Sequence, residues 1–303
     1  MRLLGVVGVL WFIGTLTFVL MHAVPGGPWD EDKQALPPEV KHNLLVLYGL
    51  DKPLLEQYAR YWLNLLHGDL GVPYQVPTET VAGVIARSWG PSAQLGLMAL
   101  VVALAIGVPC GLLAALRQNS WIDRVTTAIS TLGNAMPNFV VAILLIWLFS
   151  LSLHILPPGG WDDPTHWIMP VIAFALAPMA ISARYTRTAV LDVVHTDYVR
   201  TARAKGLVPS AVVVHHILRS ALVPILTVIG PMAAALVTGS IFVESIFRIP
   251  GLGRYFSQSV FFRDYPMIMG LTLFYAGLLA LAYLATDLLY VAVDPRISFN
   301  ERG

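Results

Sequence analysis

The chain has 303 residues, of which 56% are hydrophobic and only 12% charged, and its mean hydropathy is +0.69. Because about a quarter of the residues in an ordinary globular domain are charged, this composition indicates an integral membrane protein. The net charge of +1 argues neither for nor against a polyanionic partner. The single cysteine, Cys110, excludes an intrachain disulfide and a cysteine-based metal site.

The first apolar stretch, Leu3 to Val24, is 22 residues long and contains no charge. As a helix it would extend about 33 Å, enough to cross a hydrocarbon core of about 30 Å. A signal peptide is the alternative, but its apolar core would be shorter, and Met21-His22-Ala23 is a poor cleavage site. We therefore expect residues 1–24 to form a retained transmembrane helix.

The next segment, residues 25–91, is too polar to span a membrane. A PGGP sequence, Pro25–Pro28, ends the first span. Pro37–Leu50 and Pro53–His67 predict two short amphipathic helices, each opened by proline. A third helix is expected to begin near Thr78. The segment is patterned enough to predict a small helical subdomain rather than a linker.

Four further apolar runs predict membrane spans at Ser92–Leu116, Ile168–Leu191, Leu222–Phe247 and Tyr265–Val293. In the first of them, Gly107 and Gly111 are four residues apart, a spacing that permits close helix approach. Near the end of the second, Arg184 and Arg187 are expected to extend toward a cytoplasmic membrane boundary. Glu244, near the end of the third, is expected either to pair with Arg248 on a continuing helix or to contact substrate.

The remaining span, Val125–Leu153, is interrupted by the sequence LGNAMPNF. If the helix continued, Asn134 and Asn138 would share one face, and Pro137 would free a backbone carbonyl one turn back. Polar groups at this depth are costly unless they face protein or a wet cavity. The sequence leaves two interpretations open, an interhelical hydrogen bond and the lining of a pathway.

A polar, mostly basic segment separates the predicted spans Ile168–Leu191 and Leu222–Phe247. Within it, Asp197–Leu207 predicts a short helix that Gly206 stops, because glycine adopts the left-handed cap conformation cheaply. Pro209 follows and cannot continue the helix. The basic residues of this helix are Arg200, Arg203 and Lys205. A water-facing helix between two spans is either a solvated connector or a docking surface for another protein.

Several motifs in this chain resemble the permease subunits of oligopeptide and dipeptide ABC importers, most closely the B-type subunit of oligopeptide permeases. DYVRTARAKGL resembles the cytoplasmic coupling loop of these permeases, although Arg200-Thr201-Ala202 stands where the general pattern has Glu-Ala-Ala. The other matching motifs are PGGP, YGLDKPLLEQY (Tyr48–Tyr58), HGDLG (His67–Gly71), IFRIPGLG (Ile246–Gly253) and DPRI (Asp294–Ile297).

The resemblance implies an all-α integral membrane protein with six transmembrane helices of the type I ABC importer permease kind. It implies that residues 25–91 form an extracytoplasmic helical subdomain. Residues 92–293 would form a five-helix permease core with a coupling loop at 192–221, and residues 294–303 a cytoplasmic tail. The chain would be a transporter subunit of an ATP-driven oligopeptide importer, not an enzyme. It would form half of the translocation pathway.

The resemblance also implies partners and site residues. The implied partners are a second homologous permease, two cytoplasmic ATPase subunits and an extracytoplasmic peptide-binding protein. The chain would also contact the lipid bilayer, and no nucleic-acid partner is expected. ATP and Mg would be bound by the ATPases, so we expect no cofactor, catalytic residue or metal site in this chain. The expected ATPase-coupling residues are Asp197, Tyr198, Arg200, Thr201, Ala202, Arg203, Lys205, Gly206 and Leu207. The candidate pathway or gate residues are Asn134, Pro137, Asn138 and Glu244.

Positive charge in short loops predicts the orientation. With the N-terminus inside, eleven Lys and Arg residues lie on the cytoplasmic side, and the short outer loops carry three. Both termini and the coupling loop are therefore expected in the cytoplasm of a prokaryotic cell, with the chain in its cytoplasmic (inner) membrane.

The same sequence disfavours several other functions. The chain has no GxxxxGK[ST], HExxH or GxSxG motif, which disfavours a nucleotide-binding loop of that type, a zinc protease and a serine protease. An ion-coupled secondary carrier would often show a ladder of Asp, Glu and His through its spans, which is not seen here. A membrane anchor would not need a shaped cytoplasmic loop. Within the resembling family, dipeptides, nickel chelates and oligosaccharides are the alternative substrates.

Overall fold

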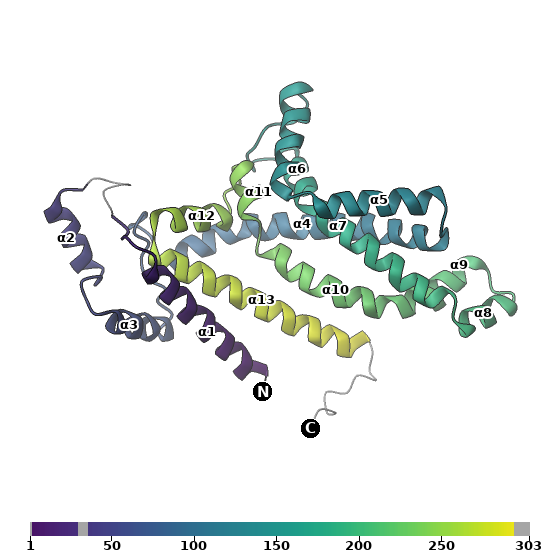
Figure 1. Ribbon diagram of the computed structural model, residues 1–303, viewed down its shortest axis with the longest axis horizontal. Helices are drawn as coiled ribbons and strands as arrows, with labels where there is room; N and C mark the ends of the chain where they lie inside the picture. Colours follow the sequence, from purple (N-terminus) through teal and green to yellow (C-terminus); the bar gives the residue numbers. More distant parts are fainter. Residues whose placement is uncertain (1, 30–35, 294–303) are drawn as a thin grey trace. The chain divides into compact units, whose positions relative to one another are not determined.

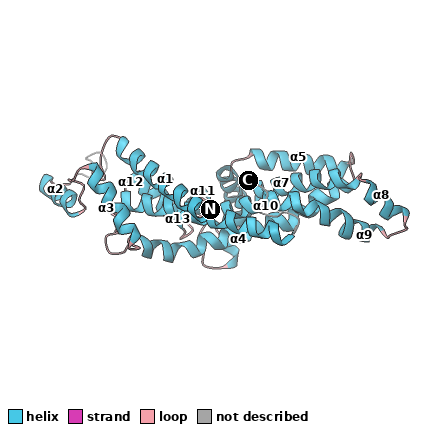
Figure 2. Ribbon diagram, turned by 90° about the horizontal axis from the view of Figure 1, so that it is seen from below, coloured by secondary structure: helices cyan, strands magenta, loops and turns pink. Residues whose placement is uncertain are grey.

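The computed structural model describes residues 2–29 and 36–293, and its regular structure there is entirely helical (Figures 1 and 2). The helices of the first half are α1 (Arg2–Ala23), α2 (Pro38–Leu47), α3 (Leu54–Leu66), α4 (Val81–Leu116), α5 (Trp121–Ala135), α6 (Asn138–Leu145) and the π-helical segment η1 (Ile146–Ser152). Those of the second half are α7 (Pro164–Val194), α8 (Asp197–Ala204), α9 (Pro209–Ala211), the π-helical segment η2 (Val212–Leu218), α10 (Arg219–Val237), α11 (Ile241–Ile246), α12 (Leu252–Phe262) and α13 (Tyr265–Val293). The DPRI motif and the expected tail at 294–303 lie outside the described residues.

By length and composition, the described residues contain five candidate membrane spans, or six if one bent pair counts as a span. The bent pair is α5 followed by α6 and η1, which meet at 101°. The cause is local: Pro137 disfavours a helical residue before it, and Met136 is extended (φ −82°, ψ 123°). An all-helical membrane fold is confirmed, but Val125–Leu153 is not one straight helix.

The chain divides into two compact units, each described by itself. The first contains residues 1–90 and 251–278, and the second contains residues 91–250 with the part of α13 from Leu279. The domain boundaries expected from the sequence stay predictions. One helix boundary was wrong: the helix expected near Thr78 and the span expected from Ser92 are a single helix, α4, that continues through Pro91.

The first unit is held together by aromatic and capping contacts. The ring of Tyr74 packs against those of Trp29 and Tyr48, with centroids 5.0 and 4.6 Å apart. Asp264 directly precedes α13 and caps it by accepting a hydrogen bond from the backbone N–H of Met267 (3.3 Å), and it accepts another from the N–H of Gln75 (3.0 Å). This buried carboxylate therefore ties the loop before α4 to the start of α13, and burial raises its pKa.

In the second unit, α4 lies directly against the backbone of α7. A Cβ at Gly107 would be 2.6 Å from the carbonyl oxygen of Met179, and one at Gly111 would collide with the carbonyl of Ala183. The close approach expected of these glycines is therefore present, and it depends on their lack of a side chain. In both views, α8 and α9 lie together beyond the ends of α5, α7 and α10 (Figures 1 and 2).

Candidate functional site

The basic loop helix forms as α8, three residues shorter than expected, because it ends at Ala204 rather than Leu207. Thr196 precedes it with extended backbone, and the acidic Asp197 occupies its first turn, where a negative charge is favourable. The helix ends as Gly206 adopts φ +79° and donates its N–H to the carbonyl of Arg203 at 3.0 Å. The left-handed conformation expected of Gly206 is thus confirmed.

One face of α8 packs into the second unit. Val199 and Ala202, three residues apart, are 0% and 5% exposed. They belong to a core cluster with residues of α4, α7, η2 and α10, namely Ala115, Ala189, Val190, Val194, Val212, Ile217, Ala221 and Ile225. Ala202 was expected on the docking surface, but its small side chain faces this core. It therefore positions the helix and contributes little surface.

The opposite face of α8 and the turn after it are exposed. We call this the α8 surface: Asp197, Tyr198, Arg200, Thr201, Arg203, Lys205, Gly206 and Leu207, all of which are exposed. Asp197 and Arg200 form an exposed ion pair at 3.6 Å, which contributes little to stability. The hydroxyl groups of Tyr198 and Ser220 hydrogen-bond at 2.9 Å and tie α8 to α10. The surface is predominantly basic and is held on a packed support.

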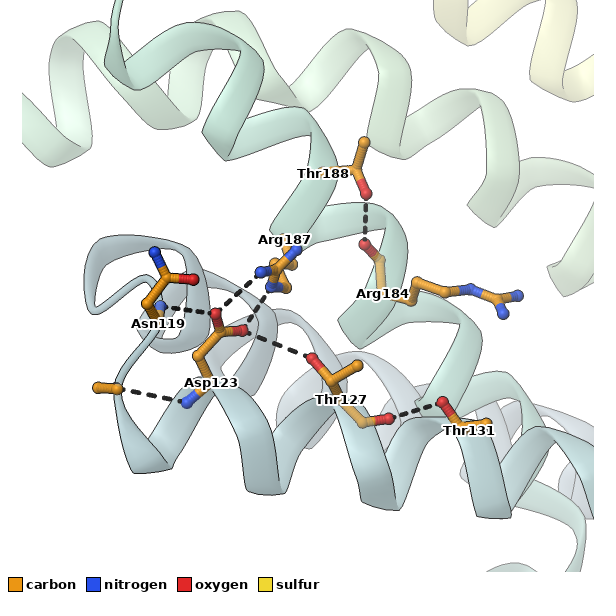
Figure 3. A network of polar contacts seen from close by, with 8 residues as sticks. Asn119, Asp123, Thr127, Thr131, Arg184, Arg187 and Thr188 are labelled. Carbon is orange, nitrogen blue, oxygen red and sulfur yellow. Dashed lines mark hydrogen bonds and ion pairs between the residues drawn. The ribbon is translucent and has the colours of Figure 1, made fainter.

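A polar network joins α5 to α7 (Figure 3). The Arg187 guanidinium donates two hydrogen bonds to the Asp123 carboxylate, from Nε to Oδ1 at 2.5 Å and from Nη2 to Oδ2 at 2.8 Å. Asp123 is 4% exposed, and its Oδ2 also accepts from the N–H of Asn119 at 2.9 Å. This bidentate arrangement is the strong geometry for an ion pair.

The expectation that both Arg184 and Arg187 extend to a membrane boundary was therefore wrong for Arg187, because Asp123 holds it within the protein. The sequence did contain a local signal for Asp123. Ser120 begins α5, its hydroxyl accepts from the N–H of Asp123, and Ser-x-x-Asp is a capping pattern. Nothing local indicated a partner 64 residues away.

The candidate pathway residues are arranged differently from the expectation. Asn134 and Asn138 do not share a helix face, because α5 ends at Ala135 and the chain bends at Pro137. Asn134 is exposed in the last turn of α5. Asn138 instead donates from Nδ2 to the hydroxyl of Ser240 at 3.2 Å, which connects α6 to the N-terminus of α11.

Ser240 also links Asn138 to Glu244. The Ser240 hydroxyl accepts from the N–H of Val243 at 3.3 Å, and Glu244 Oε1 accepts from the N–H of Ser240 at 3.1 Å. These contacts cap the start of α11. Gly239, at φ +83°, leaves the room that Glu244 occupies, because a Cβ there would collide with Glu244 Oε1. The break before α11 is thus built around a buried carboxylate.

The pairing of Glu244 with Arg248 on a continuing helix was wrong. The helix α11 ends at Ile246, and Arg248 has φ +55°, so the two residues do not follow one another on a helix. Glu244 is 0% exposed, whereas Arg248 is exposed. Sequence reasoning also missed Ser240, although Ser followed by Glu four residues on is close to a capping pattern. Over residues 2–29 and 36–293, no group of His, Cys, Asp and Glu is placed to hold a metal ion.

Comparison with known proteins identifies the family. Residues 107–299 match the model of the family described as "binding-protein-dependent transport system inner membrane component". The chain is 42% identical to the dipeptide transport system permease protein DppB of Bacillus subtilis, over 96% of this chain and 94% of that protein. It is 37% identical to the oligopeptide transport system permease protein OppB of Salmonella typhimurium, over 98% of each.

Among solved structures, the fold is similar to a chain of the inward-facing MetNI methionine ABC transporter. The TM-score is 0.58, with 20% identity, over 70% of this chain and 96% of that chain. At this identity the likeness concerns the fold alone, which agrees with the helical membrane architecture described above. The chain belongs to the family of binding-protein-dependent transport system inner membrane components, the multi-pass permease subunits of ABC importers.

Proposed function

We propose that this chain is a permease subunit of an ATP-driven peptide importer, and that oligopeptides are its substrates. The observation that carries the proposal is near full-length similarity to peptide permeases, at 42% and 37% identity. The PGGP and GLDKPL sequences support the oligopeptide branch. Dipeptides are the second candidate, which the greater identity to DppB favours.

The partners follow from the same proposal. The chain would pair with a second homologous permease, receive substrate from an extracytoplasmic binding protein and dock two cytoplasmic ATPases, which bind ATP and Mg. The α8 surface supports the ATPase assignment because it is exposed, mostly basic and fixed to the ends of α7 and α10 through its buried face. ATP-driven closure of the ATPase pair would move α8 and open the pathway alternately to the two sides.

The proposal includes orientation and gating. Both termini and the α8 surface would be cytoplasmic, on the evidence of eleven Lys and Arg residues on that side against three in the short outer loops. The break between α5 and α6 would form part of the gate, with Asn134, Pro137 and Asn138 on it. Glu244 would fix the gate through Ser240, since its carboxylate caps α11.

Reconstitution in proteoliposomes tests the function. The chain would be purified with the subunits it retains, and uptake of a labelled tetrapeptide and a labelled dipeptide would be measured. Uptake that needs both ATP and the binding protein is expected, with the tetrapeptide preferred. Transport driven by an ion gradient without ATPase subunits would instead establish a secondary carrier and refute the proposal.

Charge reversal tests the docking surface. Replacing Arg200 and Arg203 by Glu is expected to lower ATPase co-purification at least about tenfold, because opposed like charges disfavour association. Arg254→Glu, at an exposed arginine of α12, is the matched control. Unchanged ATPase retention in the double variant, with normal membrane insertion, would remove α8 as the docking site.

A further inference from the structure

Two arginines of α7, three residues apart, have opposite surroundings. Arg187 is paired with Asp123. Arg184 is exposed, and its side chain extends away from that pair (Figure 3). Its Cζ lies 5.9 Å from the ring centroid of Tyr185. Among the residues that the structure describes, no carboxylate forms an ion pair with Arg184.

Arg184 is one of the residues that line a groove of about 530 Å³ between α7 and α10. This volume is within the range of about 300–1,000 Å³ that is usual for small-ligand sites. The walls are apolar, with Phe174 and Pro178 from α7 and Pro231 and Met232 from α10. Pro178 lies inside its helix and has no N–H to donate to the carbonyl of Phe174, four residues earlier.

The groove thus combines a cation with apolar walls. A charge within a membrane-spanning helix is costly unless it faces a wet cavity or an opposite charge. A guanidinium is suited to a carboxylate because its parallel N–H groups match the two oxygens. A peptide complements both features in one molecule, because it carries a terminal carboxylate and apolar side chains.

We propose that the α7–α10 groove is a substrate subsite in which Arg184 binds the C-terminal carboxylate of a transported peptide. The side chain of the last peptide residue packs between Phe174 and Met232. This inference rests on the proposed peptide transport and goes beyond it by naming the position and chemistry of binding.

A phospholipid headgroup also carries an anion, but the order of the two arginines argues against it. Arg187 is closer to the end of α7 at Val194, where an arginine reaches a headgroup more easily. That arginine is the one neutralised by Asp123, whereas the arginine one turn deeper is exposed. This arrangement suits a ligand inside the groove.

The test compares two probes in the reconstituted complex, trialanine with a free carboxylate and trialanine amide. Uptake is measured for the wild type, Arg184→Gln, Arg184→Lys and the control Arg254→Gln. For each probe, uptake by the variant is divided by uptake by the wild type, so that any preference of the binding protein for one probe cancels. Gel filtration of each complex checks assembly, which the exposed position of Arg184 should preserve.

Arg184→Gln is expected to reduce uptake of the free acid about tenfold relative to the amide, the usual size of losing a hydrogen bond to a charged group. Arg184→Lys should recover part of this loss, and Arg254→Gln should change neither ratio. An equal fall for both probes would overturn the subsite and indicate a lipid contact or a structural role. Unchanged uptake of both would also overturn it. If the wild type takes up neither probe with ATP, peptide transport itself is refuted and the subsite with it.

Discussion

The bidentate pair between Asp123 and Arg187 gives the sharpest prediction for stability. In Asp123→Asn the side chain keeps its size, and its oxygen can still accept from the N–H of Asn119, but Arg187 loses its counter-charge. Breaking a buried ion pair by removing one partner costs about 3–5 kcal/mol. The Arg187 side chain is 27% exposed, so water recovers part of this. We expect a loss of about 2–3 kcal/mol.

A double-mutant cycle isolates the pair. Asp123→Leu and Arg187→Met are each expected to destabilise strongly, whereas the double variant should lose less than the sum, because apolar pairs of similar volume often replace buried ion pairs at little cost. The measurement is thermal unfolding of the detergent-purified complex, where 2–3 kcal/mol corresponds to a shift of about 3–5 °C for a chain of 303 residues.

The control and the refuting outcome follow from the same network. Thr127 donates to Asp123 Oδ1 at 3.5 Å, the weakest contact of the cluster, so Thr127→Val should change stability by less than about 0.5 kcal/mol. If the effects of Asp123→Leu and Arg187→Met add within about 0.5 kcal/mol, the two side chains do not stabilise each other and the reasoning is refuted.

Three further predictions concern single positions. Gly111→Leu should destabilise by at least about 1–3 kcal/mol, seen as a lower unfolding temperature, because its side chain would enter the α7 backbone at Ala183. Gly206→Val should destabilise the fold by about 1–2 kcal/mol through the left-handed backbone alone, because nothing lies within 4 Å of an added Cβ. Gly206→Asn should destabilise it clearly less. Equal unfolding temperatures for the two variants would contradict this. Burial raises the pKa of Asp264, so the folded state binds the proton of this carboxyl more tightly than the unfolded chain does. The stability gained from this proton is complete below the ordinary pKa of about 3.9 and is lost as pH rises through the raised pKa of the folded state. Asp264→Asn should therefore flatten the dependence of unfolding temperature on pH above about 4, and a parallel curve would oppose this account.

Features with local causes were predictable from the sequence. The end of α8 depends on Gly206 and on Pro209, which lie two and five residues beyond its last residue, Ala204. The membrane spans were predictable because the length of each apolar run can be read directly from the sequence. The docking role of α8 stays a prediction, and the burial of Ala202 was not anticipated, because which face of a short helix is buried depends on what packs against it.

Features with distant causes were not predictable. Arg184 and Arg187 are equivalent in the sequence and differ only because Asp123, on another helix, contacts one of them. Likewise Pro137 predicted an interruption, but the 101° bend and the contact of Asn138 with Ser240, 102 residues away, depend on tertiary packing. Pairings of this kind require the positions of three or more helices, which local patterns do not contain.

The position of α8 connects the proposed docking surface with the proposed subsite. Its buried residues Val199 and Ala202 contact a core made by the ends of α4, α7 and α10, and Tyr198 is hydrogen-bonded to Ser220 of α10. A displacement of α8 would therefore act on both α7 and α10 through these contacts. These two helices form the walls of the Arg184 groove. Because α5 is tied to α7 through Asp123, movement of α7 would also reach the bend at Pro137. Packed contacts thus run from the α8 surface to both the proposed subsite and the proposed gate.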